Sequence, residues 1–384
     1  MAFFKRLKGG RIFAPRDLGL CDLLIAGDRI AAVGQVGPIP DTLGVQEIDV
    51  RGKNISPGFI DLHVHITGGG GEAGPSTRLP DIHVSSILEA GVTTVLGVLG
   101  TDAVTRSTEN LLAKAQGLEQ EGITALALSG SYRFPDLCTL TGSLQKDIAL
   151  IPQIVGVGEI AISDHRASHA TFDDFVKVVS DCRVGGLVGN KPGLVVIHMG
   201  GGREGMAKLF RLTEETEIPI TQLLPTHVTR NETLFGEAMR FASMGGNIDI
   251  TAREKVNSDR MGLSQALERL QEGAVCMDRV TVSSDANGSL PRFDAQGRFL
   301  GMGAGSIKTL VMELQRLVGD GGHTPSDVLP LFTTNAAARL GLEGEKGEIV
   351  PGACADLAVF DENWRVESVF ARGRLRVCGG EYQG

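Results

Sequence analysis

The chain has 384 residues, of which 42% are hydrophobic, and its 37 Lys and Arg residues against 46 Asp and Glu residues give a net charge of −9. These numbers exclude a disordered or fibrous chain and leave room for one large barrel or for two to three ordinary domains. The acidic balance, with no basic run longer than Lys5-Arg6, argues against a nucleic-acid binder, so we expect small-molecule partners.

The first predicted strands are two short apolar runs, at residues 23–26 and 30–34, joined by a Gly27-Asp28 turn. Similar runs then recur eight times, each ending in glycine or a polar residue. They lie at residues 59–66, 93–99, 123–129, 155–163, 194–199, 223–228, 247–251 and 280–284.

Helical patterns separate these runs, with apolar residues three and four positions apart, as at Phe172, Phe175 and Val179. Residues 307–317 and 329–340 are predicted to be closing helices. Eight strand–helix repeats predict an α/β fold, a (β/α)8 barrel of the TIM type, in which reactive groups sit at the carboxyl ends of the strands.

The two ends of the chain do not fit this barrel. Residues 355–360 and 366–375 again read as short strands with turn signals, like those near the start. We expect the ends to pair in one small β-sandwich domain of residues 1–56 and 346–384, because the termini of a domain often lie close together. The barrel would then span residues 57–345.

The sequence also predicts a compartment. Its six cysteines are scattered and form no CxxC pair, which favours free thiols in a reducing environment. Charged residues stand near the start where a signal peptide needs its apolar segment. The longest apolar stretch, at 148–162, is interrupted by Pro152 and Glu159 and falls short of the ~18 apolar residues of a membrane span. We expect a soluble cytoplasmic protein without membrane contacts.

Candidate metal ligands stand at the ends of the predicted strands. His63 and His65 alternate along the first strand, so both imidazoles face the same side. His198 ends the fifth strand, His227 the sixth, and Asp285 follows the eighth. These groups would converge over the mouth of the barrel, and histidines with a carboxylate suit zinc.

Asp285 has a second predicted role. A carboxylate beside metal-bound water can take a proton and pass it to a leaving group. A general base next to a metal-bound hydroxide indicates hydrolysis.

These residues, with the run PGFIDLHVH at 57–65 and the split β domain, resemble the amidohydrolase superfamily. Within it, four further runs resemble the isoaspartyl dipeptidases (β-aspartyl peptidases). They are GGGGEAGP at 68–75, AISDHR at 161–166, LPTHVTRN at 224–231 and SSDANGS at 283–289. The resemblance implies hydrolysis of β-aspartyl dipeptides at two divalent metal ions, with zinc expected, and a homo-oligomer, of which an octamer is one form.

The resemblance implies one set of residues at the metals: His63, His65, His198, His227 and Asp285. It also shows one departure, because Glu159 stands where the family has a lysine carboxylated by CO₂. A glutamate carboxylate can bridge two cations unmodified, but its carboxyl carbon is three bonds from Cα instead of six. Either the strand or the metals lie closer together, or the site holds one metal, or Glu159 is an unrelated ion-pair partner.

The resemblance implies a second set at the substrate. Glu72 would bind the α-ammonium, and the aspartyl α-carboxylate would be held by Gly70, Thr101 and Ser289. Arg166 and Arg230 would bind the terminal carboxylate, to which a planar guanidinium is well suited. Tyr132 would donate a hydrogen bond to the oxyanion.

Two other readings remain open from the sequence. Glu159 leaves room for an amidohydrolase that acts on a cyclic amide or an N-acyl amino acid. A non-catalytic barrel that serves as an assembly subunit is the third.

Overall fold

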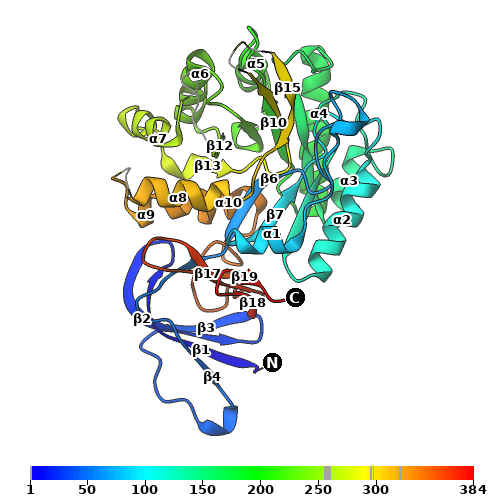
Figure 1. The fold of residues 1–384 in the computed structure, drawn as a ribbon. Coiled ribbons are helices and arrows are strands. Elements are labelled where there is room, and N and C mark those ends of the chain that lie inside the picture. Colours follow the sequence, from blue (N-terminus) through cyan, green and yellow to red (C-terminus); the bar gives the residue numbers. More distant parts are fainter. Residues whose placement is uncertain (1, 255–260, 295, 297, 320–321) are drawn as a thin grey trace.

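The computed structural model describes residues 2–254, 261–294, 296, 298–319 and 322–384 (Figure 1). Eight parallel strands form its centre, and each overlaps one of the eight predicted runs. They are β6 (Phe59–Val64), β7 (Val92–Gly97), β8 (Thr124–Ser129), β9 (Ile154–Ile162), β10 (Leu194–Met199), β11 (Leu223–Thr226), β12 (Ile248–Thr251) and β13 (Val280–Ser283).

These strands follow one another in chain order and pair in two groups. One six-stranded sheet runs β11-β10-β9-β8-β7-β6, and β12 pairs with β13. A parallel bridge between Val64 and Ala286 joins the chain after β13 to β6, and the amide of His65 donates to the carbonyl of Ala286 over 2.9 Å. The predicted TIM-type barrel is confirmed, and the carboxyl ends of its strands share one face.

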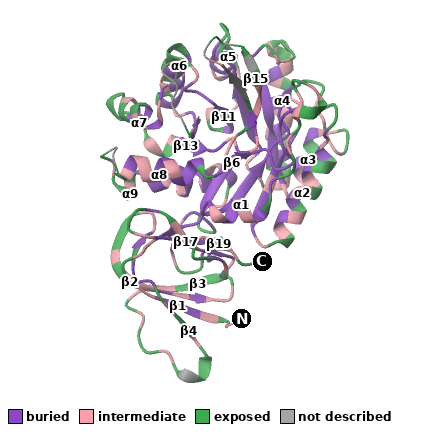
Figure 2. Ribbon diagram, viewed as in Figure 1, coloured by how far each residue is buried: buried purple, intermediate pink, exposed green. Residues whose placement is uncertain are grey.

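Helices cover the outside of the strands, and Figure 2 shows buried strands inside helices that expose one face. The helices are α1 (Val84–Glu89), α2 (Thr108–Gln120), α3 (Leu144–Leu150), α4 (Phe172–Gly189), α5 (Ala207–Glu215), α6 (Glu232–Ser243), α7 (Leu263–Glu272), α8 (Thr309–Gly319), α9 (Pro325–Val328) and α10 (Thr334–Leu340). Short 3₁₀ turns lie at η1 (Asp41–Leu43), η2 (Pro75–Thr77), η3 (Ile220–Gln222), η4 (Met277–Arg279) and η5 (Leu329–Phe332).

Two regions after β13 differ from the prediction. The single helix expected over 329–340 is wrong, because the chain forms η5 and then α10, with Thr333 between them outside helical geometry. An antiparallel hairpin, β14 (Ser289–Phe293) and β15 (Phe299–Ala304), was not predicted. Its first residue, Ser289, is one of the predicted substrate ligands.

Strands from both ends of the chain form one nine-stranded sheet, in the order β19-β18-β17-β16-β5-β1-β2-β3 with β4 beside β1. They are β1 (Phe4–Phe13), β2 (Asp17–Ala26), β3 (Arg29–Gly34), β4 (Gln46–Asp49), β5 (Asn54–Pro57), β16 (Leu357–Phe360), β17 (Val366–Ala371), β18 (Arg374–Cys378) and β19 (Glu381–Tyr382). Side chains from both halves of the sheet, such as Leu23 and Phe370, share one apolar cluster. The separate sheet built from the termini is therefore confirmed, while the domain boundaries at 56/57 and 345/346 stay a prediction.

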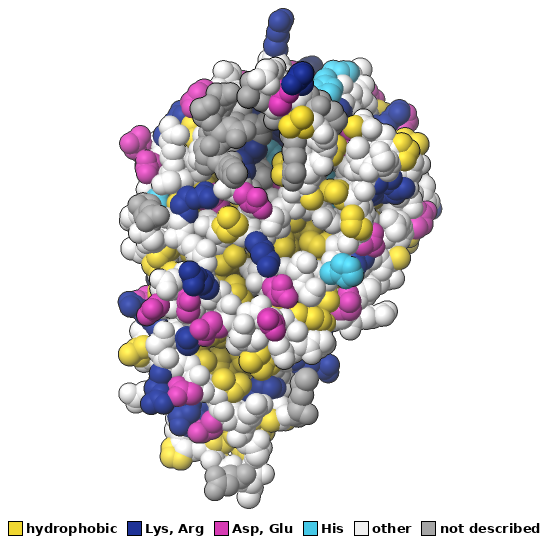
Figure 3. All heavy atoms as spheres, viewed as in Figure 1, with side chains coloured by type: hydrophobic (Ala, Val, Ile, Leu, Met, Phe, Trp, Pro, Cys, Tyr) yellow, Lys and Arg dark blue, Asp and Glu magenta, His cyan; other side chains and the backbone are white. Residues whose placement is uncertain are grey.

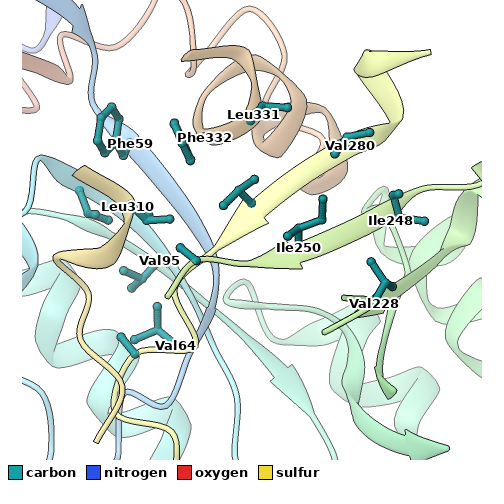
Figure 4. Close-up of a cluster of buried hydrophobic side chains, with 14 of the residues drawn as sticks. Phe59, Val64, Val95, Val228, Ile248, Ile250, Val280, Leu310, Leu331 and Phe332 are labelled. Carbon is teal, nitrogen blue, oxygen red and sulfur yellow. The ribbon is translucent and has the colours of Figure 1, made fainter. Parts of the chain in front are cut away.

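A larger apolar cluster holds the barrel to its closing helices (Figure 4). The rings of Phe59 on β6 and Phe332 in η5 lie 5.4 Å apart, and both are fully buried. Burial of one such side chain contributes ~1.5–3 kcal/mol. This packing fixes β6, the strand that carries His63 and ends just before His65.

The surface on the face shown in Figure 3 mixes basic and acidic side chains. All six cysteines are free thiols, as predicted. Within the described part of the chain, none of the helices combines the length and the apolar character that crossing a bilayer needs.

Candidate active site

The predicted metal ligands meet at the carboxyl ends of the barrel strands. His63 is on β6 and His65 follows it, while His198 is on β10. His227 follows β11 and Asp285 comes two residues after β13. Oδ1 of Asp285 lies 3.2 Å from Nε2 of His65 and 3.8 Å from Nε2 of His63. Three sets of donor atoms each lie within 4.8 Å of one another: His63, His227 and Asp285; His63, His65 and Glu159; and Glu159, His198 and His227.

Glu159, on β9, lies between these histidines and is 1% exposed. Its Oε2 atom is 3.1 Å from Nε2 of His63, 3.1 Å from Nδ1 of His198 and 3.6 Å from Nε2 of His227. Its Oε1 atom is 3.4 Å from Nε2 of His65. The two oxygens thus face different histidines, and within the described chain every ion-pair contact of Glu159 is with a histidine. The glutamate side chain, although shorter than a carboxylated lysine, thus lies close to the predicted metal ligands on or directly after β6, β10 and β11.

The charged and titratable side chains of this group shift one another's pKa values. Burial alone would raise the pKa of Glu159, but the charge of His63 and the contacts with His198 and His227 outweigh it and hold the pKa well below its usual value. Burial alone would lower the pKa of His63, but the charge of Glu159 raises it to about 9. Burial lowers the pKa of His227 to about 3, which keeps this ring neutral, as a metal ligand must be.

Buried nitrogen atoms in the same group lack partners. Nδ1 and Nε2 of His63 and Nδ1 of His65 have no hydrogen bond within the described residues, because the 3.1 Å approach of His63 to Glu159 is not aligned as one. Unpaired buried polar atoms are costly. Imidazole and carboxylate donors are those that zinc and related cations bind. The residues present therefore fit a divalent metal centre.

The backbone at two of these positions is unusual. His227 has a φ of 63° and Asp285 a φ of 53°, although neither is a glycine. Such conformations cost about 1–3 kcal/mol and cluster at functional sites. At both strand ends the conformation turns the chain so that the side chain enters the shared space.

Tyr132 lies beside the metal-binding group. Its hydroxyl is 2.7 Å from Nδ1 of His198, and the ring is buried. Burial raises the pKa of Tyr132 well above its usual value, and the charge of Glu159 adds to the effect. The hydroxyl therefore keeps its proton and is available as a hydrogen-bond donor.

The two predicted carboxylate-binding arginines approach the same histidine. Nη2 of Arg166 lies 3.3 Å, and Nη2 of Arg230 lies 3.2 Å, from Nε2 of His198. Nε of Arg230 is buried without a hydrogen-bond partner among the described residues. A buried guanidinium nitrogen without an acceptor is a natural binding point for a carboxylate.

The glycine-rich loop brings three predicted substrate ligands together. The amide of Gly70 donates to Oγ of Ser289 over 2.8 Å, and that hydroxyl donates to Oε2 of Glu72 over 2.9 Å. Glu72 also lies 3.7 Å from Nη1 of Arg166. Gly70 has a φ of 79°, and a Cβ there would lie 2.2 Å from the carbonyl oxygen of Thr77, so the loop requires glycine.

Thr101 stands apart from this chain of hydrogen bonds. It directly follows Gly100, where a Cβ would lie 2.6 Å from Cε1 of His65. Thr101 is therefore next to the metal-binding group, but its side chain forms no hydrogen bond with Gly70, Glu72 or Ser289 among the contacts of the described residues.

Sequence reasoning missed two supporting residues. Oδ2 of Asp164 lies 3.1 Å from Nε2 of His198 and accepts from Nη2 of Arg166 over 2.8 Å. Thr251 lies 2.6 Å from Nδ1 of His227 through its Oγ1 atom and fixes that ring. The Asp-His-Arg run contained Asp164 as a signal, whereas nothing in the sequence pointed to Thr251.

Comparison with known proteins agrees with this geometry. A family model described as Amidohydrolase family matches residues 54–376. The crystal structure of a β-aspartyl dipeptidase from Fervidobacterium islandicum AW-1 in complex with the β-Asp-Leu dipeptide is 40% identical, with a TM-score of 0.92 and 99% of each chain covered.

The chain is also similar to more distant proteins. An imidazolonepropionase from Ruegeria sp. (strain TM1040) is 24% identical over 94% of this chain and 92% of its own length. A D-hydantoinase (dihydropyrimidinase) from Thermus sp. has a TM-score of 0.67 at 18% identity, with 99% of this chain and 96% of that one covered.

Proposed function

The chain belongs to the amidohydrolase family and, within it, to the β-aspartyl (isoaspartyl) dipeptidases, and we propose that it hydrolyses the β-aspartyl peptide bond of dipeptides at a divalent metal centre. One observation carries this proposal. Arg166 and Arg230 lie within 3.3 Å of His198, and Glu72 lies 3.7 Å from Arg166, so acidic and basic side chains that could bind the opposite charges of a β-aspartyl dipeptide stand beside the metal-binding group. The non-catalytic alternative is set aside, because the family and its dipeptidase relatives are enzymes.

We propose that the site holds two divalent metal ions and that these ions are zinc. His63, His65, His198, His227 and Asp285 would hold them, and Glu159 would bridge them. Glu159 belongs both to the set of donor atoms with His63 and His65 and to the set with His198 and His227, which supports the bridge. When bound, such cations supply a nucleophilic water at neutral pH and polarise the scissile carbonyl.

For the substrate we propose that Glu72 binds the α-ammonium, while Gly70, Thr101 and Ser289 hold the aspartyl α-carboxylate. Arg166 and Arg230 would bind the carboxylate of the leaving residue. The hydrogen bonds from Gly70 to Ser289 and from Ser289 to Glu72 support a shared aspartyl subsite. The unpaired Nε of Arg230 supports the carboxylate subsite.

Two side chains would take part in the chemical step, one by stabilising the developing oxyanion and one by transferring the proton of the attacking water. Tyr132 keeps its proton and would donate a hydrogen bond to the oxygen on which negative charge develops. Burial alone would raise the pKa of Asp285, but contacts with His65, His227 and His63 outweigh it and hold the pKa well below its usual value. Asp285 is then a carboxylate that takes a proton from the attacking water and delivers it to the leaving nitrogen as the C–N bond breaks.

We also propose that the protein acts as a homo-oligomer in the cytoplasm. Exposed apolar side chains on neighbouring helices α3 and α4, Leu150, Leu187 and Val188, support association between copies. The six free thiols support a reducing compartment.

A substrate panel tests the proposal. Metal-loaded protein is incubated with β-Asp-Leu, N-acetyl-leucine and a cyclic amide such as hydantoin, and the leucine released from the first two and the ring-opened product of the third are measured. Cleavage of β-Asp-Leu alone supports a dipeptidase. Activity on the acyl amino acid or the cyclic amide, with none on the dipeptide, would favour the second amidohydrolase reading.

A further inference from the structure

Arg106 is a buried arginine that lies outside the metal-binding group. It stands just before α2, and its side chain is 2% exposed. Its guanidinium faces the loop that follows β6, residues 65–80, which we call the glycine loop because it contains four consecutive glycines. This loop carries Gly70 and Glu72, two of the proposed substrate ligands.

The guanidinium of Arg106 makes five polar contacts. Four are with main-chain carbonyl oxygens of the glycine loop: Nε donates to Thr67 over 3.2 Å, Nη2 donates to Gly69 over 2.9 Å and to Leu79 over 3.2 Å, and Nη1 approaches Gly70 at 3.5 Å. The loop doubles back so tightly here that a Cβ at Gly68 would lie 2.2 Å from the carbonyl oxygen of Leu79. Arg106 therefore binds both arms of the loop.

The fifth contact reaches a second loop. Nη1 of Arg106 donates to Oδ2 of Asp102 over 2.9 Å. Oδ1 of Asp102 in turn accepts from the amides of Val104 and Thr105, over 3.1 and 2.8 Å, and shapes the turn that follows Thr101. One guanidinium thus joins the loop after β6 to the loop after β7, and each loop carries proposed ligands of the aspartyl end.

We propose that Arg106 is a positioning residue that sets the geometry of the aspartyl subsite, with Asp102 as its partner. This rests on the proposed function. An arginine offers five N–H groups in a fixed plane, and here all five are directed at acceptors, whereas a lysine offers three around a point. Arg106→Lys keeps the charge but cannot hold both arms of the glycine loop and Asp102 together, so Glu72 and Gly70 would lose their fixed positions.

The test uses two substrates that differ only at the aspartyl amino group, β-Asp-Leu and N-succinyl-leucine. The metal-loaded wild-type enzyme should prefer β-Asp-Leu, because Glu72 binds its ammonium. In Arg106→Lys we expect the KM for β-Asp-Leu to rise about 10- to 100-fold, because a displacement of Glu72 and Gly70 by about 1 Å is enough for such a loss. The preference for β-Asp-Leu over N-succinyl-leucine should fall by a similar factor. A general loss of stability would lower the amount of active enzyme without changing this ratio.

Two further variants keep the test decisive. Asp102→Asn breaks the same clamp from the other loop and should shift the ratio in the same direction, even if Arg106→Lys folds poorly. Arg376→Lys is the matched control, since Arg376 also donates to a main-chain carbonyl, that of Glu121, but lies in the terminal sheet. It should leave KM and the ratio unchanged.

Hydrogen exchange separates this inference from the proposed function. In Arg106→Lys the amides of Gly69, Gly70 and Gly71 should exchange faster than in the wild type, whatever the substrate. If the wild type cleaves no β-aspartyl dipeptide, the proposed function fails, but faster exchange still supports the clamp. Unchanged exchange together with an unchanged KM and substrate ratio in both Arg106→Lys and Asp102→Asn would overturn the inference.

Discussion

Oε2 of Glu159 lies 3.1 Å from Nε2 of His63, and both side chains are 1% exposed. A carboxylate buried this deeply needs partners, and those it has among the described residues are histidines that are themselves predicted to bind metal. The relationship supports the proposal that Glu159, although shorter than a carboxylated lysine, bridges the metals. It also makes the dependence of the site on CO₂ testable.

Metal reconstitution should not require CO₂. If the Glu159 carboxylate is the bridge, metal-free protein that is reloaded with zinc in CO₂-free buffer should recover the same activity as protein reloaded with bicarbonate. Recovery that depends on added bicarbonate would contradict the bridge. Glu159→Gln, which removes the charge but keeps the shape, should bind fewer metal equivalents by elemental analysis.

Removal of the metal should destabilise the fold. Four buried histidines and two carboxylates face one another in the metal-free protein, and a cation present at about 1,000 times its Kd adds about 4 kcal/mol to the free energy of unfolding. A chelator should therefore lower Tm by several degrees, and zinc should restore it. A Tm that is the same with and without chelator would mean that these side chains hold no stabilising ion.

Loss of the tyrosine hydroxyl should affect the chemical step. Tyr132→Phe removes the proposed oxyanion donor beside His198, so we expect kcat to fall by about 10²–10³-fold with little change in KM. Circular dichroism and metal content serve as controls for the fold and the site. A variant with wild-type kcat would remove Tyr132 from the reaction.

The leaving residue should be recognised through its carboxylate. We expect Arg230→Ala to cost about 2–5 kcal/mol in kcat/KM for β-Asp-Leu, because a buried charge pair is broken. The same variant should show a much smaller loss with β-Asp-leucinamide, which has no terminal carboxylate. Equal losses with the two substrates would show that Arg230 acts elsewhere. Arg211→Ala, an exposed arginine on α5 that pairs with Glu215, is a suitable control.

The sequence predicted the barrel, and the side chains that meet at the ends of its strands, because the relevant signals are local. Each barrel strand is a short apolar run, and His63, His198 and His227 stand at or directly after such runs. It did not predict β1. The charged residues Lys5 and Arg6 interrupt the apolar pattern around the buried Leu7. A register shift between Leu7 and Gly10 also breaks the alternation of apolar and polar residues that marks a strand.

The parts of the site that were missed depend on contacts between distant segments. The place of Asp164 between Arg166 and His198 requires β9 and β10 to be paired, and the link from Ser289 to the glycine loop requires a hairpin with weak strand signals. From the sequence, Glu159 looked too short to bridge two metals, because its carboxyl carbon is three bonds from Cα whereas that of a carboxylated lysine is six. The structure shows that its carboxylate reaches four histidines on or just after three different strands, an arrangement that the sequence does not encode locally.

The central claim is hydrolysis of a β-aspartyl bond at this metal centre, and a comparison of two isomeric dipeptides tests it most directly. The kcat/KM of the zinc-loaded enzyme is measured for β-Asp-Leu and for α-Asp-Leu, with Asp285→Asn as the inactive control. We predict cleavage of β-Asp-Leu, at least about tenfold weaker cleavage of α-Asp-Leu because its carboxylate and ammonium miss their subsites, and loss of activity in Asp285→Asn. Equal cleavage of both isomers, or cleavage of neither, would contradict the account.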